Sequence, residues 1–157
     1  MMTIDTTALT IARHIKAPPA TVWRAWSEPD HFAKWWIPAP IECQVVKLDL
    51  RPGGGFETRM REGDGPFQPH VAGCFLEIVP AARVVFTTVL TEDWQPFEPW
   101  LALTAIMTFT AENNGTLYSA RVLHRNADDA NKHDEMGFQQ GWGAALGQLA
   151  AHVATMG

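Results

Sequence analysis

The spacing of hydrophobic side chains predicts a run of strands in the middle of the chain. From about residue 41 to residue 124, apolar and polar positions alternate. In the segment 56–61, Phe56, Thr58 and Met60 fall on one face and charged side chains on the other. This alternation is typical of antiparallel strands with one buried face. Turn-forming sequences divide the region into six expected strands, at residues 41–50, 56–61, 71–79, 84–91, 101–111 and 116–124.

The first part of the chain predicts one more strand and two short helices. Apolar side chains alternate over residues 9–15, and Pro18 and Pro19 then end this strand. Because a proline suits the first turn of a helix, we expect a short helix directly after them. A second short helix is expected at residues 31–36.

After the last expected strand the hydrophobic period becomes helical. Trp142, Leu146, Leu149 and Val153 recur at intervals of three or four residues and form one stripe. We predict one long helix from about residue 130 to residue 155.

Four glycines interrupt this predicted helix, at Gly137, Gly141, Gly143 and Gly147. Each destabilises a helix by up to about 1 kcal/mol relative to alanine. They form two pairs with a spacing of four, so each pair lies on one face of the helix. Either the sheet approaches the helix closely at these positions, or they leave room for a ligand.

The order of the elements predicts an α+β fold. A run of consecutive strands implies an antiparallel sheet, and the long helix is the element able to cover its apolar face. We therefore expect a curved sheet of about seven strands wrapped around a C-terminal helix, with two short helices after the first strand. A length of 157 residues suits a single domain, with residues 1–8 as an N-terminal tail.

The composition narrows the functional classes. Hydrophobic residues make up 46% of the chain and charged residues 18%, which excludes intrinsic disorder. The net charge is −5 and no cluster of lysine and arginine exists, so we expect no nucleic-acid partner. The sequence has no apolar run of about 18 residues and no signal-peptide pattern, and Cys43 and Cys74 are isolated; we predict a cytoplasmic protein without membrane contact. Seven tryptophans against one tyrosine indicate a roomy apolar interior or an adhesive surface.

Several segments resemble a known family. They are HIKAPPATVWRAWSEPDHFAKWW at 14–36, DLRPGGGFETRM at 49–60, GCFLEIVPAARVVFTT at 73–88, GTLYSARVLH at 115–124 and GWGAALGQLAAHV at 141–153. Over residues 9–153 the chain is similar to the homologues of the activator of heat-shock-protein-90 ATPase, within the START-related SRPBCC superfamily. The resemblance implies a helix-grip fold with a hydrophobic cavity between sheet and helix. It also implies a function among those of the superfamily, whose members bind lipids, sterols or polyketides, or act as cyclases, aromatases or hydrolases.

Our leading hypothesis is that the protein binds a hydrophobic or aromatic small molecule in this cavity. Ligand pockets are commonly apolar with a few polar groups that converge on the ligand. Strand alternation and helix facing predict the lining residues Trp35, Phe56, Met60, Met107, His124, Met136, Gly137 and Gln140.

A second hypothesis is a cyclase-type or hydrolase-type enzyme. His124 shares the expected inner face with Ala120 and Val122, and a histidine there is either a satisfied core residue or a general acid or base. Glu77 is the candidate partner. We predict no metal and no cofactor, because the histidines form no HxH or HExxH motif and the cysteines are isolated; no GxSxG motif exists either.

The loop at residues 92–100 carries three large aromatic side chains, Trp94, Phe97 and Trp100. Exposed apolar surface commonly marks a binding site. We expect this loop to be a lid over the cavity, the contact surface of a homodimer, or a segment whose aromatic side chains only pack against the domain. A third hypothesis uses the same aromatic side chains to bind a protein, with the chain acting as a chaperone-accessory or stress-response module.

Overall fold

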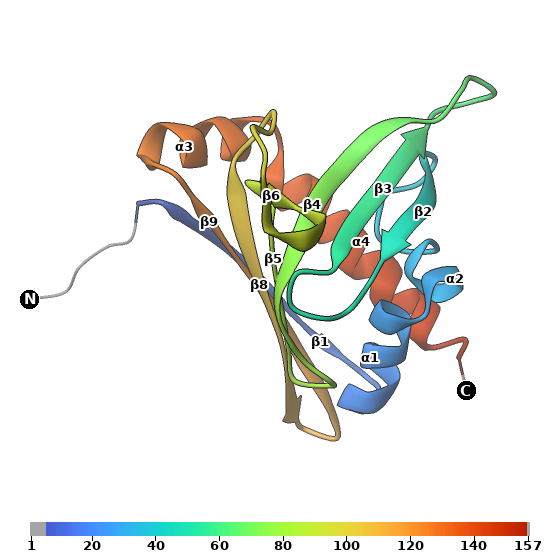
Figure 1. The fold of residues 1–157 in the computed structure, drawn as a ribbon. Coiled ribbons are helices and arrows are strands. Elements are labelled where there is room, and N and C mark those ends of the chain that lie inside the picture. The colour runs from blue at the N-terminus through green and yellow to red at the C-terminus, as the bar shows by residue number, and fades with distance from the viewer. Residues whose placement is uncertain (1–5, 157) are drawn as a thin grey trace, which may run out of the picture.

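Seven antiparallel strands form one curved sheet, and a C-terminal helix packs on it (Figure 1). The computed structural model describes residues 6–156. The strands are β1 (Ala8–Ile15), β2 (Glu42–Leu48), β3 (Gly55–Arg61), β4 (Gln68–Val79), β5 (Arg83–Thr87), β8 (Leu103–Glu112) and β9 (Gly115–His124), in the spatial order β1-β9-β8-β5-β4-β3-β2. The predicted α+β fold class is confirmed. Of the expected tail, residues 1–5 lie outside the described residues and Ala8 already belongs to β1.

The strand predicted at residues 84–91 is shorter in the structure. β5 ends at Thr87, and the chain then forms a separate two-stranded ribbon of β6 (Leu90–Thr91) and β7 (Gln95–Pro96), joined by the short helix η1 (Glu92–Trp94). The hydroxyl of Thr88 donates to the carbonyl oxygen of Leu101 at 2.9 Å and so fixes the point where the chain leaves the sheet.

The two short helices follow β1 as predicted. They are α1 (Pro19–Ser27) and α2 (Pro29–Phe32), and each begins with a proline. The second helix starts and ends earlier than the expected 31–36, since Pro29 initiates it and the residues after Phe32 form turns. None of the helices within residues 6–156 is long and apolar enough to span a bilayer.

The prediction of one continuous C-terminal helix is wrong. The structure has α3 (Ala127–Glu135) and α4 (Phe138–Val153), separated by Gly137 at φ +99°. The left-handed region of backbone conformation is readily available to glycine, which therefore commonly ends helices. The side chain of Asn126 caps the start of α3 by accepting from the amide of Asp129 at 2.8 Å.

The glycines of α4 differ in what surrounds them. A Cβ atom on Gly143 would lie 3.5 Å from Ile11, and one on Gly147 would lie 3.7 Å from Arg13, so side chains of β1 pack over these two positions. A Cβ on Gly141 would meet nothing within 4 Å. A methyl group at Gly143 or Gly147 would therefore make ordinary van der Waals contact with β1, while Gly141 faces open space.

The different environments of Gly137 and Gly141 predict opposite effects of alanine. We expect Gly141→Ala to raise the free energy of unfolding by up to about 1 kcal/mol, because alanine favours the helix and nothing obstructs its methyl group. We expect Gly137→Ala to lower it by about 1–2 kcal/mol, because its left-handed conformation strains any residue with a Cβ. Urea denaturation of both variants tests this; equal effects of the same sign would contradict the assignment of the helix break.

Candidate functional site

Three buried tryptophans from α1 and the turn after α2 differ in their hydrogen bonding. The indole N–H of Trp26 donates to the hydroxyl of Tyr118 at 2.9 Å, and that of Trp35 donates to the carbonyl oxygen of Ala25 at 2.9 Å. The indole nitrogen of Trp36 is buried and has no hydrogen-bond partner among the described residues. An unpaired buried donor costs about 1–3 kcal/mol. Trp36 therefore has a buried N–H group that lacks a hydrogen-bond acceptor.

Aromatic rings from both layers surround Trp36. The ring of Phe32 stacks on it with centroids 5.0 Å apart, and Phe56 of β3 and Phe86 of β5 lie at 5.6 and 6.2 Å. Trp142 of α4 approaches at 6.0 Å and is only half-buried. Trp36 itself is 9% exposed. Its ring thus lies between the sheet and α4, close to the surface on the α4 side.

The structure separates the predicted lining residues into two groups. Trp35, Phe56 and Met107 are fully buried in one core cluster, and Met60 packs against that cluster half-buried. Met136 is 47% exposed and Gln140 is also exposed, because the helix break at Gly137 places them outside the packed layer. We did not predict Trp36 as a lining residue; its neighbour Trp35, which we did predict, already has its N–H paired.

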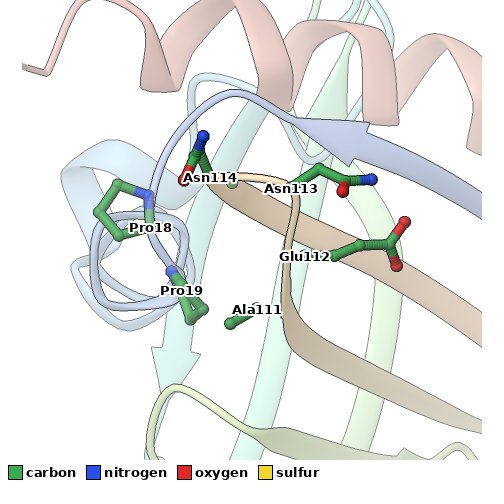
Figure 2. Close-up of a pocket in the computed structure, with 7 residues that line it drawn as sticks. Pro18, Pro19, Ala111, Glu112, Asn113 and Asn114 are labelled. Atoms are coloured by element: carbon green, nitrogen blue, oxygen red, sulfur yellow. The ribbon is translucent and has the colours of Figure 1, made fainter.

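Among the surface hollows of the described residues are two that include none of the predicted lining residues. One, of about 520 Å³, lies between Pro18, Pro19 and the β8–β9 hairpin at 111–115. Figure 2 shows the side chains of Glu112 and Asn113 in this hollow pointing away from the two prolines. The other, of about 330 Å³, is lined by Ala33, Lys34, Ile37, Ala39, Ile41, Glu42, Cys43 and Gln148. Between the sheet and α4, aromatic side chains occupy the interior.

His124 lies on the inner face at the end of β9 and uses both ring nitrogens. Its Nδ1 donates to the carbonyl oxygen of Thr7 at 2.8 Å, so in the neutral ring Nε2 accepts, and the partner there is Nδ1 of His133 at 2.8 Å. His133 in turn packs edge-on against Phe138, with ring centroids 5.2 Å apart. The pair ties β9 to α3 and to the residue before β1.

Burial and the neighbouring His124 lower the pKa of His133 to about 4, while Asp134 acts weakly in the opposite direction. A second cation 2.8 Å from the first would have no acceptor to face. At neutral pH His133 is therefore uncharged, and its Nδ1 lies within hydrogen-bond distance of Nε2 of His124.

The proposed catalytic partners are not brought together. Glu77 pairs in register with Val85 on the outer face of the sheet and forms an ion pair with Arg83 there. His124 lies on the inner face, with both nitrogens already bonded. The structure thus provides no acid partner for His124 at Glu77.

The aromatic loop is attached at both ends. The ring of Trp94 covers Gly53, where an added Cβ would lie 2.8 Å from it, and the amide of Asp93 donates to the carbonyl oxygen of Gly53 at 2.9 Å. Further on, Trp100 is 75% exposed and Lys132 of α3 lies over its ring, 5.4 Å from the centroid. Phe97, between them, is 45% exposed. Trp94 therefore packs on the turn before β3, and Trp100 contacts α3.

Within the described part of the chain, no three His, Cys, Asp or Glu side chains come together in a way that could hold a metal ion. Burial raises the pKa of the Cys43 thiol to about 11, so this thiol stays protonated at neutral pH. These observations leave the unpaired Trp36 and the histidine pair as the unusual chemistry of the interior.

A curved sheet that grips a C-terminal helix, with two short helices after the first strand, defines the START-like class of proteins. The chain belongs to the Activator of Hsp90 ATPase homolog 1-like protein family, whose sequence profile matches residues 16–154. The resemblance inferred from the sequence is confirmed.

Solved structures support the same assignment. Protein NE0264 from Nitrosomonas europaea is 35% identical over 96% of this chain and 97% of its own, with a TM-score of 0.86. Protein Ms6760 from Mycobacterium smegmatis is 26% identical over 97% of this chain and 93% of its own, with a TM-score of 0.77. CalU16 from Micromonospora echinospora, 22% identical over 94% of this chain and 76% of its own with a TM-score of 0.62, shares the fold. The comparison with curated proteins gives no match.

The lowered pKa of His133 predicts that acid destabilises the protein. Unfolded histidine titrates near pH 6.5 and folded His133 near pH 4, so between these values the unfolded chain binds more protons. The contribution is fully present above about pH 6.5 and is lost as the pH falls toward 4. Allowing for solvent screening of a half-buried ring, we expect a loss of about 1 kcal/mol from pH 7.5 to pH 5.

Urea denaturation across this pH range measures the loss. His133→Asn keeps a donor near the position of Nδ1 but does not titrate, so its stability should depend less on pH than that of the wild type. His14→Asn, a substitution on β1 outside the histidine pair, is the matched control. Its free energy of unfolding should depend on pH as that of the wild type does. Equal slopes for His133→Asn and the wild type would show that His133 does not cause the effect.

Proposed function

We propose that this protein binds an apolar small molecule that carries a hydrogen-bond acceptor, in a site between the sheet and α4 centred on Trp36. The observation that carries the proposal is the buried, unpaired indole N–H of Trp36. A ligand carbonyl, ether or hydroxyl oxygen that reached this N–H would remove the cost of burying it unpaired. The fold of the family, which the superfamily uses to hold lipids, sterols and polyketides, supports this placement.

The surroundings of Trp36 favour a flat, hydrophobic ligand. Phe56, Phe86 and Trp142 present ring faces and edges at stacking distances from it. The interior is filled in the absence of ligand, so a ligand enters by displacing side chains rather than by filling an existing void. The half-buried Trp142 and Met60 are suited to move, since Met60 is flexible and the surface beside Trp142 at Gly141 is open.

Displacement makes binding weaker than in a preformed cavity. A protein that binds only in a minor, opened conformation has its affinity reduced by the population of that conformation. We therefore infer micromolar rather than nanomolar affinity for small aromatic probes.

The exposed Phe97 and Trp100 favour a different function, the binding of a protein through the aromatic loop. The partner would be a second copy of the chain or a chaperone-class protein. Static light scattering of the wild type and of Trp100→Ser tests the first case. A dimer that the substitution converts to a monomer supports it, and a wild-type monomer contradicts it.

No arrangement of the described residues favours the enzymatic alternative with His124 and Glu77.

Two matched compounds test the ligand-binding proposal. 1-Tetralone has a carbonyl acceptor, and tetralin has the same two rings without it. We expect the wild type to bind tetralone about tenfold more tightly, which corresponds to one net hydrogen bond of about 1.4 kcal/mol. In Trp36→Phe the two compounds should bind equally, because the donor is gone and the ring remains. Isothermal titration calorimetry measures both affinities.

Trp23→Phe is the matched control, since Trp23 is half-buried against Phe109 and makes no ring contact with Trp36. It should keep the tenfold preference for tetralone. Trp36→Phe should fold, because it removes an unpaired donor and no hydrogen bond; its circular dichroism melt verifies this. Failure of the wild type to bind either compound would overturn the proposal. Persistence of the preference in Trp36→Phe would overturn the assignment of Trp36.

A further inference from the structure

We propose that α3 is an acid-sensitive flap, which the hydrogen bond between His124 and His133 holds closed at neutral pH and which opens when both rings are protonated. The part of this inference that concerns ligand entry rests on the proposed function; the opening of the flap does not.

α3 has little apolar anchorage of its own. Ala130 is its one buried residue, and most of its other side chains are exposed. Its side-chain links to the rest of the molecule include the His124–His133 bond, the packing of His133 on Phe138, the ion pair of Asp129 with Arg125 and the contact of Lys132 with Trp100. A segment with so few buried contacts opens at low cost compared with global unfolding.

Gly137 provides a hinge at the end of α3. Its φ of +99° is open to glycine, and it separates α3 from α4. α4 is anchored differently, since Phe138, Leu146 and Leu149 are buried in the core. Movement at Gly137 can therefore release α3 while α4 stays in place.

The hydrogen-bonding capacity of the two rings sets the proton requirement. With Nδ1 of His124 donating to Thr7, the neutral pair places one N–H and one lone pair between His124 Nε2 and His133 Nδ1. A first proton leaves this bond intact if it adds to the free Nε2 of His133. A second proton puts two N–H groups and two positive charges face to face, and the bond is lost. Release of α3 is thus coupled to uptake of the second proton.

The charged groups on the neighbouring elements do not remove this dependence of α3 release on the second proton. α4 has no charged side chain from residue 138 to residue 151, and neither has the segment 6–12, which contains the start of β1, nor the segment 101–104, which leads into β8. The charged side chains on α3 are Asp128, Asp129, Lys132, Asp134 and Glu135, Arg121 lies on β9 and Arg125 follows it, and Glu98 belongs to the aromatic loop. Among them Asp134 favours protonated His133, but less strongly than burial and His124 oppose it, and Asp129 is held by Arg125 at 3.1 Å.

A chain of ring contacts leads from the flap to the proposed ligand site. His133 packs on Phe138 at 5.2 Å, Phe138 on Trp142 at 5.3 Å, and Trp142 on Trp36 at 6.0 Å. Opening of α3 takes His133 away from Phe138, so Phe138 loses a ring neighbour and can yield more easily when a ligand displaces Trp142.

Hydrogen exchange followed by mass spectrometry tests the flap, at pH 7.5 and pH 5.0 and with correction for the intrinsic exchange rates. Because folded His133 titrates near pH 4 and an exposed histidine near pH 6.5, and with the same allowance for solvent screening, opening of α3 should become about fivefold more populated at pH 5.0. Peptides that cover residues 127–136 should lose protection, while those that cover 142–152 in α4 should not.

Two substitutions distinguish protonation of the His124–His133 pair from other effects of low pH on the protein. His133→Asn retains a donor toward His124 without a second titrating ring, so α3 should change by less than about twofold between the two pH values. His152→Asn removes the other histidine pair, in which His31 Nδ1 and His152 Nε2 lie 2.9 Å apart, and should leave the wild-type response of α3 unchanged. Unchanged protection of α3 in the wild type would overturn the proposal. So would a wild-type response in His133→Asn, or an equal loss of protection in α4. Should His133→Asn fail to fold, the comparison of α3 with α4 in the wild type decides.

Stopped-flow mixing with 1-tetralone tests the link to ligand entry. The association rate should rise at pH 5.0 in the wild type and stay constant in His133→Asn. Exchange that shows the opening, together with no binding of tetralone at either pH, would overturn the proposed function and leave the flap. Binding of tetralone without opening of α3 would overturn the flap and leave the proposed function standing.

Discussion

The packing of Trp26 against five aromatic rings joins the layers of this fold. Phe32, Trp35, Trp36, Phe56 and Phe75 lie within 6.4 Å of it, centroid to centroid, and come from α2, the following turn, β3 and β4. Its N–H reaches Tyr118 on β9, near the opposite edge of the sheet. Such pairs each contribute about 0.5–1.5 kcal/mol beyond the burial of their area. The two short helices are thereby fixed to the sheet, and Trp36 is held in a position where its own N–H has no partner.

The strands could be predicted from the sequence because their side chains have a period of two. Once Ala120 and Val122 are placed on the inner face of β9, His124 must share that face, and the structure places it there. The break at Gly137 could not be placed in the same way. Four glycines in one predicted helix all lower helix stability, and only the tertiary arrangement of α3 and α4 shows which of them takes a left-handed conformation. Because the helix breaks at Gly137, Met136 and Gln140 are exposed. The prediction that they line a cavity had assumed one continuous helix.

The candidate site shows a related limit. Trp35 and Trp36 are adjacent, and their orientation depends on where α2 ends, which the sequence gives only to within a few residues. No local pattern distinguishes an indole whose N–H finds a carbonyl, as that of Trp35 finds Ala25, from one whose N–H finds nothing. The pairing of His124 with His133 is equally hidden. It requires α3 to fold back along β9 at a distance that the capping by Asn126 and the bend at Gly137 determine together.

The two helices at the end of the chain are anchored by two kinds of interaction, which differ in their sensitivity to pH. α4 is held by buried apolar side chains such as Leu146 and Leu149, and burial of this kind depends little on pH. α3 buries Ala130 alone among its residues, and its hydrogen bond between His133 and His124 depends on a proton. Because Gly137 lies between the two helices, loss of the polar contact need not disturb the apolar one. The difference bears on the proposed site, because α4 carries Trp142, which contacts Trp36, and Phe138, which links Trp142 to His133 of α3. A ligand that displaces Trp142 therefore meets less resistance where Phe138 has lost its contact with His133 than where α3 keeps that contact in place.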